Sequence, residues 1–347
     1  MNPLDDIIFV SAYSLAACAL AFVLAPPFIR YLVRNKVGKQ IREKATDGRV
    51  AAMFNALHAK KVGTPTMGGI LIWGVTFIVA GLSRLLALLG LVDKSLLQRK
   101  ETYLPLATLL ATALLGAIDD LFNIHGYGTS KGINVKPKFL WLLMFAVGGA
   151  WWFYSKLGYD TINMPFVGDF AIGPLYVPLF ILVIISSAHA VNITDGLDGL
   201  AGGLLAIAFT AFGIISYALG LVWLTAFCGV IVGTLIAFLW FNVSPAKFMM
   251  GDTGALSLGS TLGVIAMLTD SVVPLVIIGG VFVAETLSVI IQLTSKRLRD
   301  GKKVFLIAPI HHHFEALGWP EHNVVFRFWI VGALLAVVGV IVRLASL

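Results

Sequence analysis

Two adjacent aspartates, Asp119 and Asp120, are the clearest candidates for chemistry in this chain. They follow an apolar segment that begins near Tyr103, so both carboxylates are expected where a membrane helix meets water. Adjacent carboxylates repel each other, and a divalent cation or a shared proton would relieve the repulsion. A solvated helix end is the alternative, although acidic groups at a helix C-terminus oppose the helix dipole. The pair is therefore a candidate catalytic or metal site.

A second acidic segment, residues 192–201, holds two Asp-Gly steps three residues apart, Asp195-Gly196 and Asp198-Gly199. Glycine permits tight turns and close approach of the backbone to a ligand, and Asp198 is a candidate cap for the following helix. The acids lack the alternate spacing and the final glutamate of an EF-hand, which excludes that calcium site. A plain turn with a helix cap is the alternative, but the position opposite the paired aspartates favours a binding site.

A third loop, residues 242–254, reaches Gly251-Asp252 at the start of a predicted helix. Free amides at a helix N-terminus, flanked by glycine and lysine, can receive phosphate oxygens. The loop lacks the GxxxxGK[ST] spacing of a Walker loop, and an aspartate near a helix start is common. Residues 60–69 place two lysines and two threonines beside glycines, which also suits phosphate contact. A positively charged membrane anchor is the alternative for that segment.

Three consecutive histidines, His311, His312 and His313, lie in the last long polar loop. Adjacent residues on a helix point about 100° apart, so the three cannot all bind one zinc ion from a regular helix. The HExxH zinc motif is also absent. Contact with a phosphate or a sugar, or proton transfer, is favoured over metal binding.

A polar face in the ninth predicted span consists of Glu285, Ser288 and Gln292 at i, i+3, i+7 spacing. Such a face in an apolar helix should point into the bundle interior. Together, the acidic loops offer ligands for a divalent cation, and the lysines, glycines and histidines suit phosphates and sugars. These residue types favour Mg²⁺-assisted phosphoryl transfer, but they do not identify the substrate.

The elements that must position these residues are apolar helices. Of 347 residues, 59% are hydrophobic and 12% are charged, and the mean hydropathy is +0.92. These values exclude a soluble globular protein and a disordered chain, and long unbroken apolar runs favour helices over a β-barrel. Glycine pairs at 202–203 and 279–280 mark places where helices pack closely or bend. We predict an all-α polytopic integral membrane protein, a single domain over residues 1–347, with about ten spans that start near Ile7, Met67, Tyr103, Lys138, Pro174, Asp198, Leu221, Thr253, Val272 and Val324.

Basic residues are distributed unevenly between the two predicted sides. Loops after odd-numbered spans hold sixteen lysines and arginines, and the other loops and chain ends hold six. Because cytoplasmic loops are enriched in these residues, both termini are predicted to lie outside, with the active site on the cytoplasmic face. The net charge of +7 is therefore assigned to membrane orientation, and we predict no nucleic-acid partner.

The paired aspartates and the loops at residues 192–201 and 242–254 resemble the shared motifs of the polyprenyl-phosphate N-acetylhexosamine-1-phosphate transferases. Within this family, GTPTMGG at 63–69, PIHHHFE at 309–315 and RFW at 327–329 are similar to the branch that acts on N-acetylmuramoyl-pentapeptide. The resemblance covers about residues 60–329 and keeps the ten-span layout.

This resemblance implies a reaction. Phospho-N-acetylmuramoyl-pentapeptide would pass from UDP-N-acetylmuramoyl-pentapeptide to undecaprenyl phosphate, giving lipid I and UMP, with Mg²⁺ as the cofactor. That reaction is the first membrane step of peptidoglycan synthesis. The resemblance also implies a homodimer in the bacterial cytoplasmic (inner) membrane, surrounded by membrane lipid.

The resemblance further implies roles for individual residues. Asp252 matches the Mg²⁺ ligand, Asp119 and Asp120 match the pair that deprotonates or positions the lipid phosphate, and His312 completes the catalytic set. The positions that match the nucleotide and substrate pocket are Lys61, Thr66, Asn192, Asp195, Gly196, Leu197, Asp198, Asn242, Met249, Gly251, Gln292, His311 and His313.

The chain departs from the family pattern at two of these places. Asn123 stands where members usually carry a lysine, three residues after the second aspartate. The candidate substitutes are Lys131, Lys136 and Lys138. Met249 stands where a phenylalanine usually stacks on uracil, and Phe248, its neighbour in sequence, should point in a different direction.

Three alternatives stay open at this point. Phosphoryl transfer could occur in one step, or through a covalent intermediate on one of the paired aspartates. A sister transferase would use UDP-N-acetylglucosamine, which the histidine motif disfavours. An ion or solute transporter would also use intramembrane acids and broken helices, but these acids crowd one membrane face, and Glu285 alone lies at depth.

Overall fold

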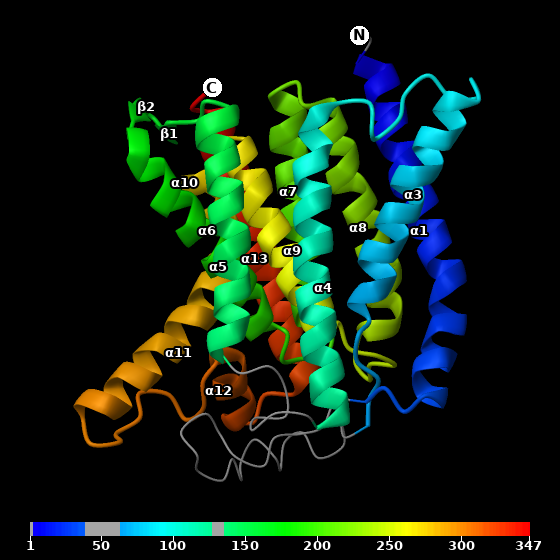
Figure 1. Cartoon of the computed structure of the whole chain (residues 1–347). Helices are drawn as coiled ribbons and strands as arrows, with labels where there is room; N and C mark the ends of the chain where they lie inside the picture. The colour runs from blue at the N-terminus through cyan, green and yellow to red at the C-terminus, as the bar shows by residue number, and fades with distance from the viewer. Residues whose placement is uncertain (1–2, 39–62, 127–134) are drawn as a thin grey trace.

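Small residues let the helices at the centre of the bundle pack closely. The computed structural model describes residues 3–38, 63–126 and 135–347. α9 (Gly251–Leu268) is rich in glycine, serine and threonine and packs against α4 (Tyr103–His125) and α6 (Tyr176–Thr194) (Figure 1). A Cβ atom on Gly259 would lie 2.6 Å from the carbonyl oxygen of Ser187 on α6. Glycine is therefore required for this close approach of α9 and α6.

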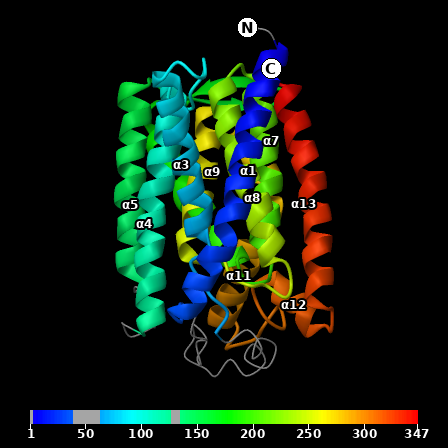
Figure 2. The same cartoon turned by 90° about the vertical axis from the view of Figure 1, so that its right-hand side faces the viewer.

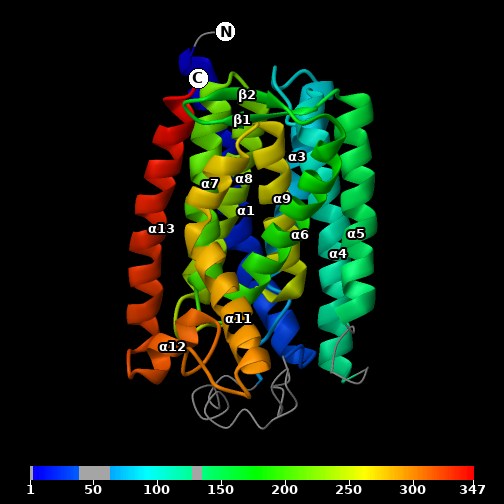
Figure 3. The same ribbon diagram turned by 90° about the vertical axis from the view of Figure 1, so that its left-hand side faces the viewer.

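The other helices complete the bundle, as the views in Figures 2 and 3 show from two further sides. They are α1 (Pro3–Arg34), α3 (Gly69–Leu88), α5 (Val135–Trp151), α7 (Leu200–Ala218), α8 (Val222–Asn242), α10 (Val272–Ile278), α11 (Gly280–Leu298), α12 (Ile310–Ala316) and α13 (Glu321–Leu344), with single turns at Lys100–Thr102, Trp152–Lys156 and Gly173–Leu175. α1 packs along α8, and α13 packs along α7. A Cβ atom on Gly203 of α7 would lie 2.0 Å from the Trp329 ring on α13, so the predicted close packing at this glycine pair is confirmed.

Seven of the described helices are long and apolar enough to cross a membrane, and α10 with α11 would make an eighth, broken span. Each of the ten predicted segments contains a helix, but α5, with 17 residues, and α9 fall outside that set. The chain is a multi-pass, predominantly helical membrane protein, as predicted. The ten-span layout stays a prediction.

The helix pair α10 and α11 bends by 79° at Gly279. A bend at this glycine pair was expected from the sequence, since glycine tolerates the change of backbone direction. α11 consequently slants away from the bundle axis and brings the polar residues of its inner face toward α12 (Figure 1).

Both chain termini lie at one end of the bundle, and α12 lies at the opposite end (Figures 1 and 3). The terminal end also carries a short antiparallel hairpin, β1 (Thr161–Met164) with β2 (Gly168–Ala171), in which Thr161 faces Ala171. Asp270, between α9 and α10, accepts a hydrogen bond from the backbone N–H of Asn163, at 3.0 Å from Oδ1. Burial raises the pKa of the Asp270 carboxyl above its usual range, against the opposing effects of this hydrogen bond and of Arg343.

α4 is longer than the sequence indicated. The predicted span ended at the paired aspartates, but the helix continues to His125 and stops at Gly126, which has φ +69°. A glycine in the left-handed conformation is a common helix terminator. Asp119 and Asp120 therefore lie inside the last turns of the helix, and both are buried.

Candidate active site

The paired aspartates meet the start of α9 because α4 and α9 touch through a glycine. A Cβ atom on Gly116, one turn before Asp120, would lie 2.2 Å from the carbonyl oxygen of Asp252. At this distance Asp120 reaches the first turn of α9: its Oδ1 accepts the backbone N–H of Asp252 at 3.1 Å, and its Oδ2 accepts that of Thr253 at 3.0 Å. Asp120 therefore caps α9 and fixes where Asp252 stands.

Lys138, in the first turns of α5, links the other two carboxylates. Its Nζ lies 2.9 Å from Oδ2 of Asp119 and also contacts the Asp252 carboxylate. Asn192, near the end of α6, donates a hydrogen bond from Nδ2 to Oδ1 of Asp252 at 2.9 Å. Four helices thus supply one polar cluster, made of Asp119, Asp120, Lys138, Asn192 and Asp252, which we call the acidic cluster.

The side chains of the acidic cluster are of the kind that bind a divalent cation. Three carboxylates and one ammonium leave it with a net negative charge, and carboxylate oxygens are ligands that Mg²⁺ prefers. Within the described ranges, no group of three acidic, histidine or cysteine side chains is arranged to hold a metal by itself. Mg²⁺ commonly binds one or two carboxylates and completes its shell with substrate phosphates and water. Asp252 and Asp119 meet that requirement.

Lys138 is the candidate substitute that the structure brings to the paired aspartates. Sequence reasoning could not choose among the three lysines, because none follows Asp120 at the family spacing. Lys131 lies outside the described residues, and the Lys136 side chain is not among those described either. Asn123 itself is buried on α4.

The loop before α3 closes one side of the acidic cluster. The backbone N–H of Met249 donates to the Pro65 carbonyl at 2.7 Å, and that of Gly68 donates to the Met249 carbonyl at 2.8 Å. Gly251 has φ +74°, and a Cβ atom there would lie 2.6 Å from Oδ2 of Asp120 and 2.8 Å from Oγ1 of Thr66. Glycine is thus required at 251 by both backbone conformation and space. Lys61, predicted for this loop, lies outside the described residues.

The Thr66 hydroxyl lies beside Gly251, at the same side of the acidic cluster. Its side chain is 1% exposed, and Oγ1 has no hydrogen-bond partner in the part of the chain that the structure describes. A buried hydroxyl without a partner is costly, so the predicted substrate-binding role fits its environment.

Phe248 and Met249 differ in burial although they are adjacent in sequence. Phe248 is fully buried and packs edge-on against Phe238, with ring centroids 4.9 Å apart. It is therefore a core residue. Met249 is half-buried in the loop that faces α3, at the position where the family pattern places a stacking side chain.

Asn242 and Asp198 hold the surrounding loops together. Asn242 accepts the backbone N–H of Gly199 at 3.0 Å and donates to the Phe248 carbonyl at 2.8 Å. Asp198 accepts the backbone N–H of Ala246 at 3.0 Å. Asp198 was expected to cap the following helix, but Gly199 takes the cap position of α7. The Asp198 carboxylate instead contacts the loop between α8 and α9, which holds Ala246.

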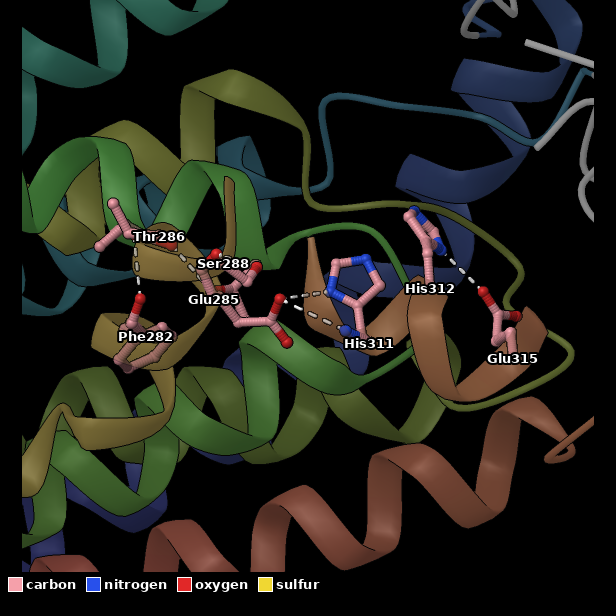
Figure 4. Close-up of polar contacts among 9 residues, drawn as sticks. Phe282, Glu285, Thr286, Ser288, His311, His312 and Glu315 are labelled. Carbon is pink, nitrogen blue, oxygen red and sulfur yellow. Dashed lines mark hydrogen bonds and ion pairs between the residues drawn. The ribbon is translucent and has the colours of Figure 1, made fainter. Parts of the chain in front are cut away.

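The histidine motif lies in and beside α12 and forms two carboxylate pairs (Figure 4). Nδ1 of His311 lies 2.9 Å from Oε2 of Glu285 on α11, and Nδ1 of His312 lies 2.7 Å from Oε2 of Glu315. His313 accepts the backbone N–H of Leu306 at 3.2 Å. The three rings therefore have three separate environments, and they do not converge on one metal ion.

Gln292 supports this motif from α11. Its Oε1 accepts the backbone N–H groups of Val304 and Phe305, each at 3.0 Å, and its Nε2 donates to the Phe305 carbonyl at 2.8 Å. All three residues of the predicted polar face, Glu285, Ser288 and Gln292, are buried, so the expected inward orientation is confirmed.

The turn at Asp195-Gly196 connects the acidic cluster to the histidine motif. It directly follows α6, which carries Asn192, and a Cβ atom on Gly196 would lie 2.3 Å from Nε2 of His311. Leu197 is 1% exposed and belongs to the core. Sequence reasoning did not assign Glu315, although it lies three residues after His312 in the same motif, a spacing that places both on one helix face.

Comparison with known proteins shows the family to which the chain belongs. The model of glycosyl transferase family 4 matches residues 102–270. Phospho-N-acetylmuramoyl-pentapeptide-transferase from Chloroflexus aurantiacus is 40% identical over 339 residues, which cover 94% of this chain and 87% of that protein. The protein of the same name from Geobacillus sp. is 40% identical, and the match covers 93% of this chain and 94% of that protein. The one from Shouchella clausii is 39% identical, and the match covers 96% of each chain.

Proposed function

The chain belongs to the phospho-N-acetylmuramoyl-pentapeptide-transferase family and is a transferase, and we propose that it forms lipid I. In this reaction, phospho-N-acetylmuramoyl-pentapeptide passes from UDP-N-acetylmuramoyl-pentapeptide to undecaprenyl phosphate, and UMP is released. The observation that carries the proposal is the convergence of Asp119, Asp252 and Lys138 at one end of a multi-pass membrane protein whose relatives bear this name.

Mg²⁺ is the cofactor in this proposal, with Asp252 as its ligand and Asp119 beside it. When bound, it would draw negative charge from the diphosphate of the donor. Asn192 holds one oxygen of Asp252 by a hydrogen bond, so it orients the carboxylate. Asp120 acts indirectly, because it accepts the backbone N–H of Asp252 and so fixes the first turn of α9.

Lys138 supplies the fixed positive charge of the site. Its ammonium lies between Asp119 and Asp252, where phosphate oxygens of the donor and the lipid would also need a cation. Such a preorganised charge stabilises the transition state of phosphoryl transfer, in which negative charge spreads over the equatorial oxygens.

The proposed transfer forms one bond and breaks one. An oxygen of the lipid phosphate bonds to the phosphorus that carries the sugar, and the bond from that phosphorus to the UMP oxygen breaks, so UMP leaves with the electron pair. The lipid phosphate is already anionic near neutral pH and needs positioning more than a strong base. An attack by Asp119 or Asp120 through a covalent intermediate is the alternative route.

The setting of the reaction is part of the proposal. We place the acidic cluster on the cytoplasmic face of a bacterial inner membrane, because the basic residues are concentrated in the loops at that end. The functional unit in this proposal is a homodimer, by similarity to the family.

The direct test is UMP release by detergent-purified protein with undecaprenyl phosphate and UDP-N-acetylmuramoyl-pentapeptide. We expect release that requires the lipid and Mg²⁺ and stops with EDTA. Asp252→Ala should abolish it without unfolding the protein, because loss of a metal ligand removes several kcal/mol of charge stabilisation. Asp93→Ala is the matched control, since this exposed aspartate lies at the terminal end of the bundle.

Two results would reject the proposal. Strong turnover of UDP-N-acetylglucosamine, with none of the pentapeptide donor, would identify a sister transferase. Solute uptake by proteoliposomes without any UMP release would identify a transporter.

A further inference from the structure

Two glutamate–histidine pairs lie side by side at α12, and they differ in their surroundings (Figure 4). The rings of His311 and His312 are 4.0 Å apart, and each ring turns Nδ1 toward its own glutamate. Glu315 belongs to α12 itself, so the His312 pair is local. Glu285 comes from α11, twenty-six residues away, and both it and His311 are fully buried.

The buried pair leaves two polar atoms unsatisfied. Within the described ranges, Nε2 of His311 and Oε1 of Glu285 have no hydrogen-bond partner. A buried polar atom without a partner is costly and calls for an explanation, such as a ligand that supplies the missing partner. The Glu285 carboxylate also lies in an apolar stretch of α11. An ionisable side chain in such a segment is costly, and it is usually paired or takes part in function.

Nε2 of His311 faces a substrate-binding segment. The nearest atoms to a Cβ on Gly196 would be Nε2 and Cε1 of His311, at 2.3 and 2.9 Å, so this edge of the ring lies directly against the Asp195-Gly196 turn. The same turn follows the end of α6, which carries the Asn192 partner of Asp252. A side chain at 196 would occupy the space in front of Nε2.

We propose that Glu285 is a positioning residue that holds His311 so that its Nε2–H donates a hydrogen bond to an oxygen of the UDP-sugar donor at the Asp195-Gly196 turn. A carboxylate on Nδ1 fixes the tautomer and the ring orientation of a histidine. With Nδ1 held by Glu285, Nε2 is the nitrogen left to face the ligand. This inference rests on the proposed function and extends it by one residue.

The test compares donor binding in Glu285→Gln and Glu285→Leu with that of the unmodified protein. Glutamine keeps an acceptor for Nδ1–H but loses the charge, and leucine loses both. We expect calorimetric Kd values for UDP-N-acetylmuramoyl-pentapeptide to rise in the order unmodified, Gln, Leu, by about tenfold or more for Leu. KM for the donor should rise as well, with KM for undecaprenyl phosphate unchanged.

Ser288→Ala is the matched control on the same helix face. Ser288 is also buried, one turn along α11, and among the described residues its hydroxyl donates within the helix, to the Glu285 carbonyl at 2.6 Å. This variant should retain the donor Kd of the unmodified protein. Thermal unfolding of each variant shows whether it is folded, and Glu285→Gln keeps the test valid if Glu285→Leu fails to fold.

A double-mutant cycle separates positioning from general stability. If Glu285 acts through His311, then Glu285→Gln should change the donor Kd by less than about twofold in a His311→Ala background. Equal effects with and without His311, or an unchanged Kd in folded Glu285→Leu, would overturn the inference.

Binding of UDP alone shows which part of the donor carries the oxygen that His311 contacts. A loss of UDP affinity in Glu285→Gln assigns the contact to the nucleotide part, and a loss confined to the complete donor assigns it to the sugar-peptide part. The two proposals fail differently: no UMP release by the unmodified protein rejects the proposed function, whereas normal release with unaltered Glu285 variants rejects only the role of Glu285.

Discussion

At the scale of single residues, Lys138 organises the acidic cluster. It contacts two carboxylates from different helices, and its side chain is mostly buried. An ammonium in that position reduces the repulsion between Asp119 and Asp252 and leaves a cation for the substrate phosphates. Lys138 is therefore our candidate, from a different helix, for the positive charge that Asn123 does not carry.

Replacement of Lys138 tests this role. We expect Lys138→Met to lower kcat about a hundredfold or more, because a fixed charge is lost where negative charge develops. Lys138→Arg should be less severe, since the guanidinium keeps the charge but not the compact geometry of the ammonium. Steady-state UMP release measures both, and Lys156→Met is a control because Lys156 lies over the Trp151 ring in the single turn that follows α5, at the other end of that helix from Lys138. Normal kcat in folded Lys138→Met would contradict the assignment.

At the scale of helices, Asp120 differs from Asp119 although the two are adjacent. Its two oxygens accept the amides of the second and third residues of α9, Asp252 and Thr253, and these contacts are those of a helix cap between α4 and α9. Asp119 instead faces Lys138. The paired motif therefore divides into a residue that faces the site and a residue that anchors the neighbouring helix.

We expect Asp120→Ala to reduce the free energy of unfolding by about 1–3 kcal/mol, because two backbone amides, that of buried Thr253 and that of partly buried Asp252, lose their acceptor. Asp120→Asn keeps one side-chain oxygen and should lose less. Asp119→Asn changes a side chain that contacts Lys138, and it should lower UMP release with little change in stability. Thermal unfolding in detergent measures the difference, and equal destabilisation by the two asparagine variants would disprove it.

The hairpin at the terminal end carries a pH-dependent contact. Because burial raises the pKa of Asp270 in the folded protein, the folded state retains a proton that the unfolded state releases above about pH 4. The free energy of unfolding should therefore fall as pH rises from the ordinary aspartate value through the raised one.

Asp270→Asn should remove this pH dependence, since asparagine still accepts the Asn163 N–H but does not ionise. The measurement is the thermal midpoint in detergent across that pH range. Asp160→Asn, an exposed acid next to the hairpin, should keep the slope of the unmodified protein. If the thermal midpoint of Asp270→Asn changes with pH as steeply as that of the unmodified protein, the pH dependence comes from other groups.

The sequence predicted helix positions better than contacts between helices. Apolar runs and glycines located α9 and the α10–α11 bend, because length and backbone freedom are local properties. The extension of α4 to His125 was missed, because the last turns mix polar and apolar residues and only Gly126 marks the stop. The capping role of Asp120 and the cross-loop contact of Asp198 depend on helices brought together by packing, which no local pattern encodes.

At the scale of the whole molecule, both termini share one end of the bundle (Figure 1). The acidic cluster lies near the opposite end, where α4 ends and α9 begins. The motif residues gather there because α4 and α6 end, and α9 begins, at that end. The sequence could predict this shared end from span alternation alone. It could not predict the contact between His311 and Gly196, which depends on the slant of α11 and the placement of α12.

The orientation of the molecule in the membrane can be measured with single cysteines. In a background with Cys18 and Cys228 replaced by alanine, Ser155→Cys places a thiol at the terminal end and Lys303→Cys places one between α11 and α12, both at exposed positions. Because the loops at the Lys303 end carry the excess of basic residues, we expect that end to face the cytoplasm. An impermeant thiol reagent should then label Ser155→Cys in intact spheroplasts and Lys303→Cys only after permeabilisation. The reverse pattern would place the acidic cluster outside, where the cytoplasmic pool of a UDP-linked donor could not reach it, and would exclude the proposed reaction in cells.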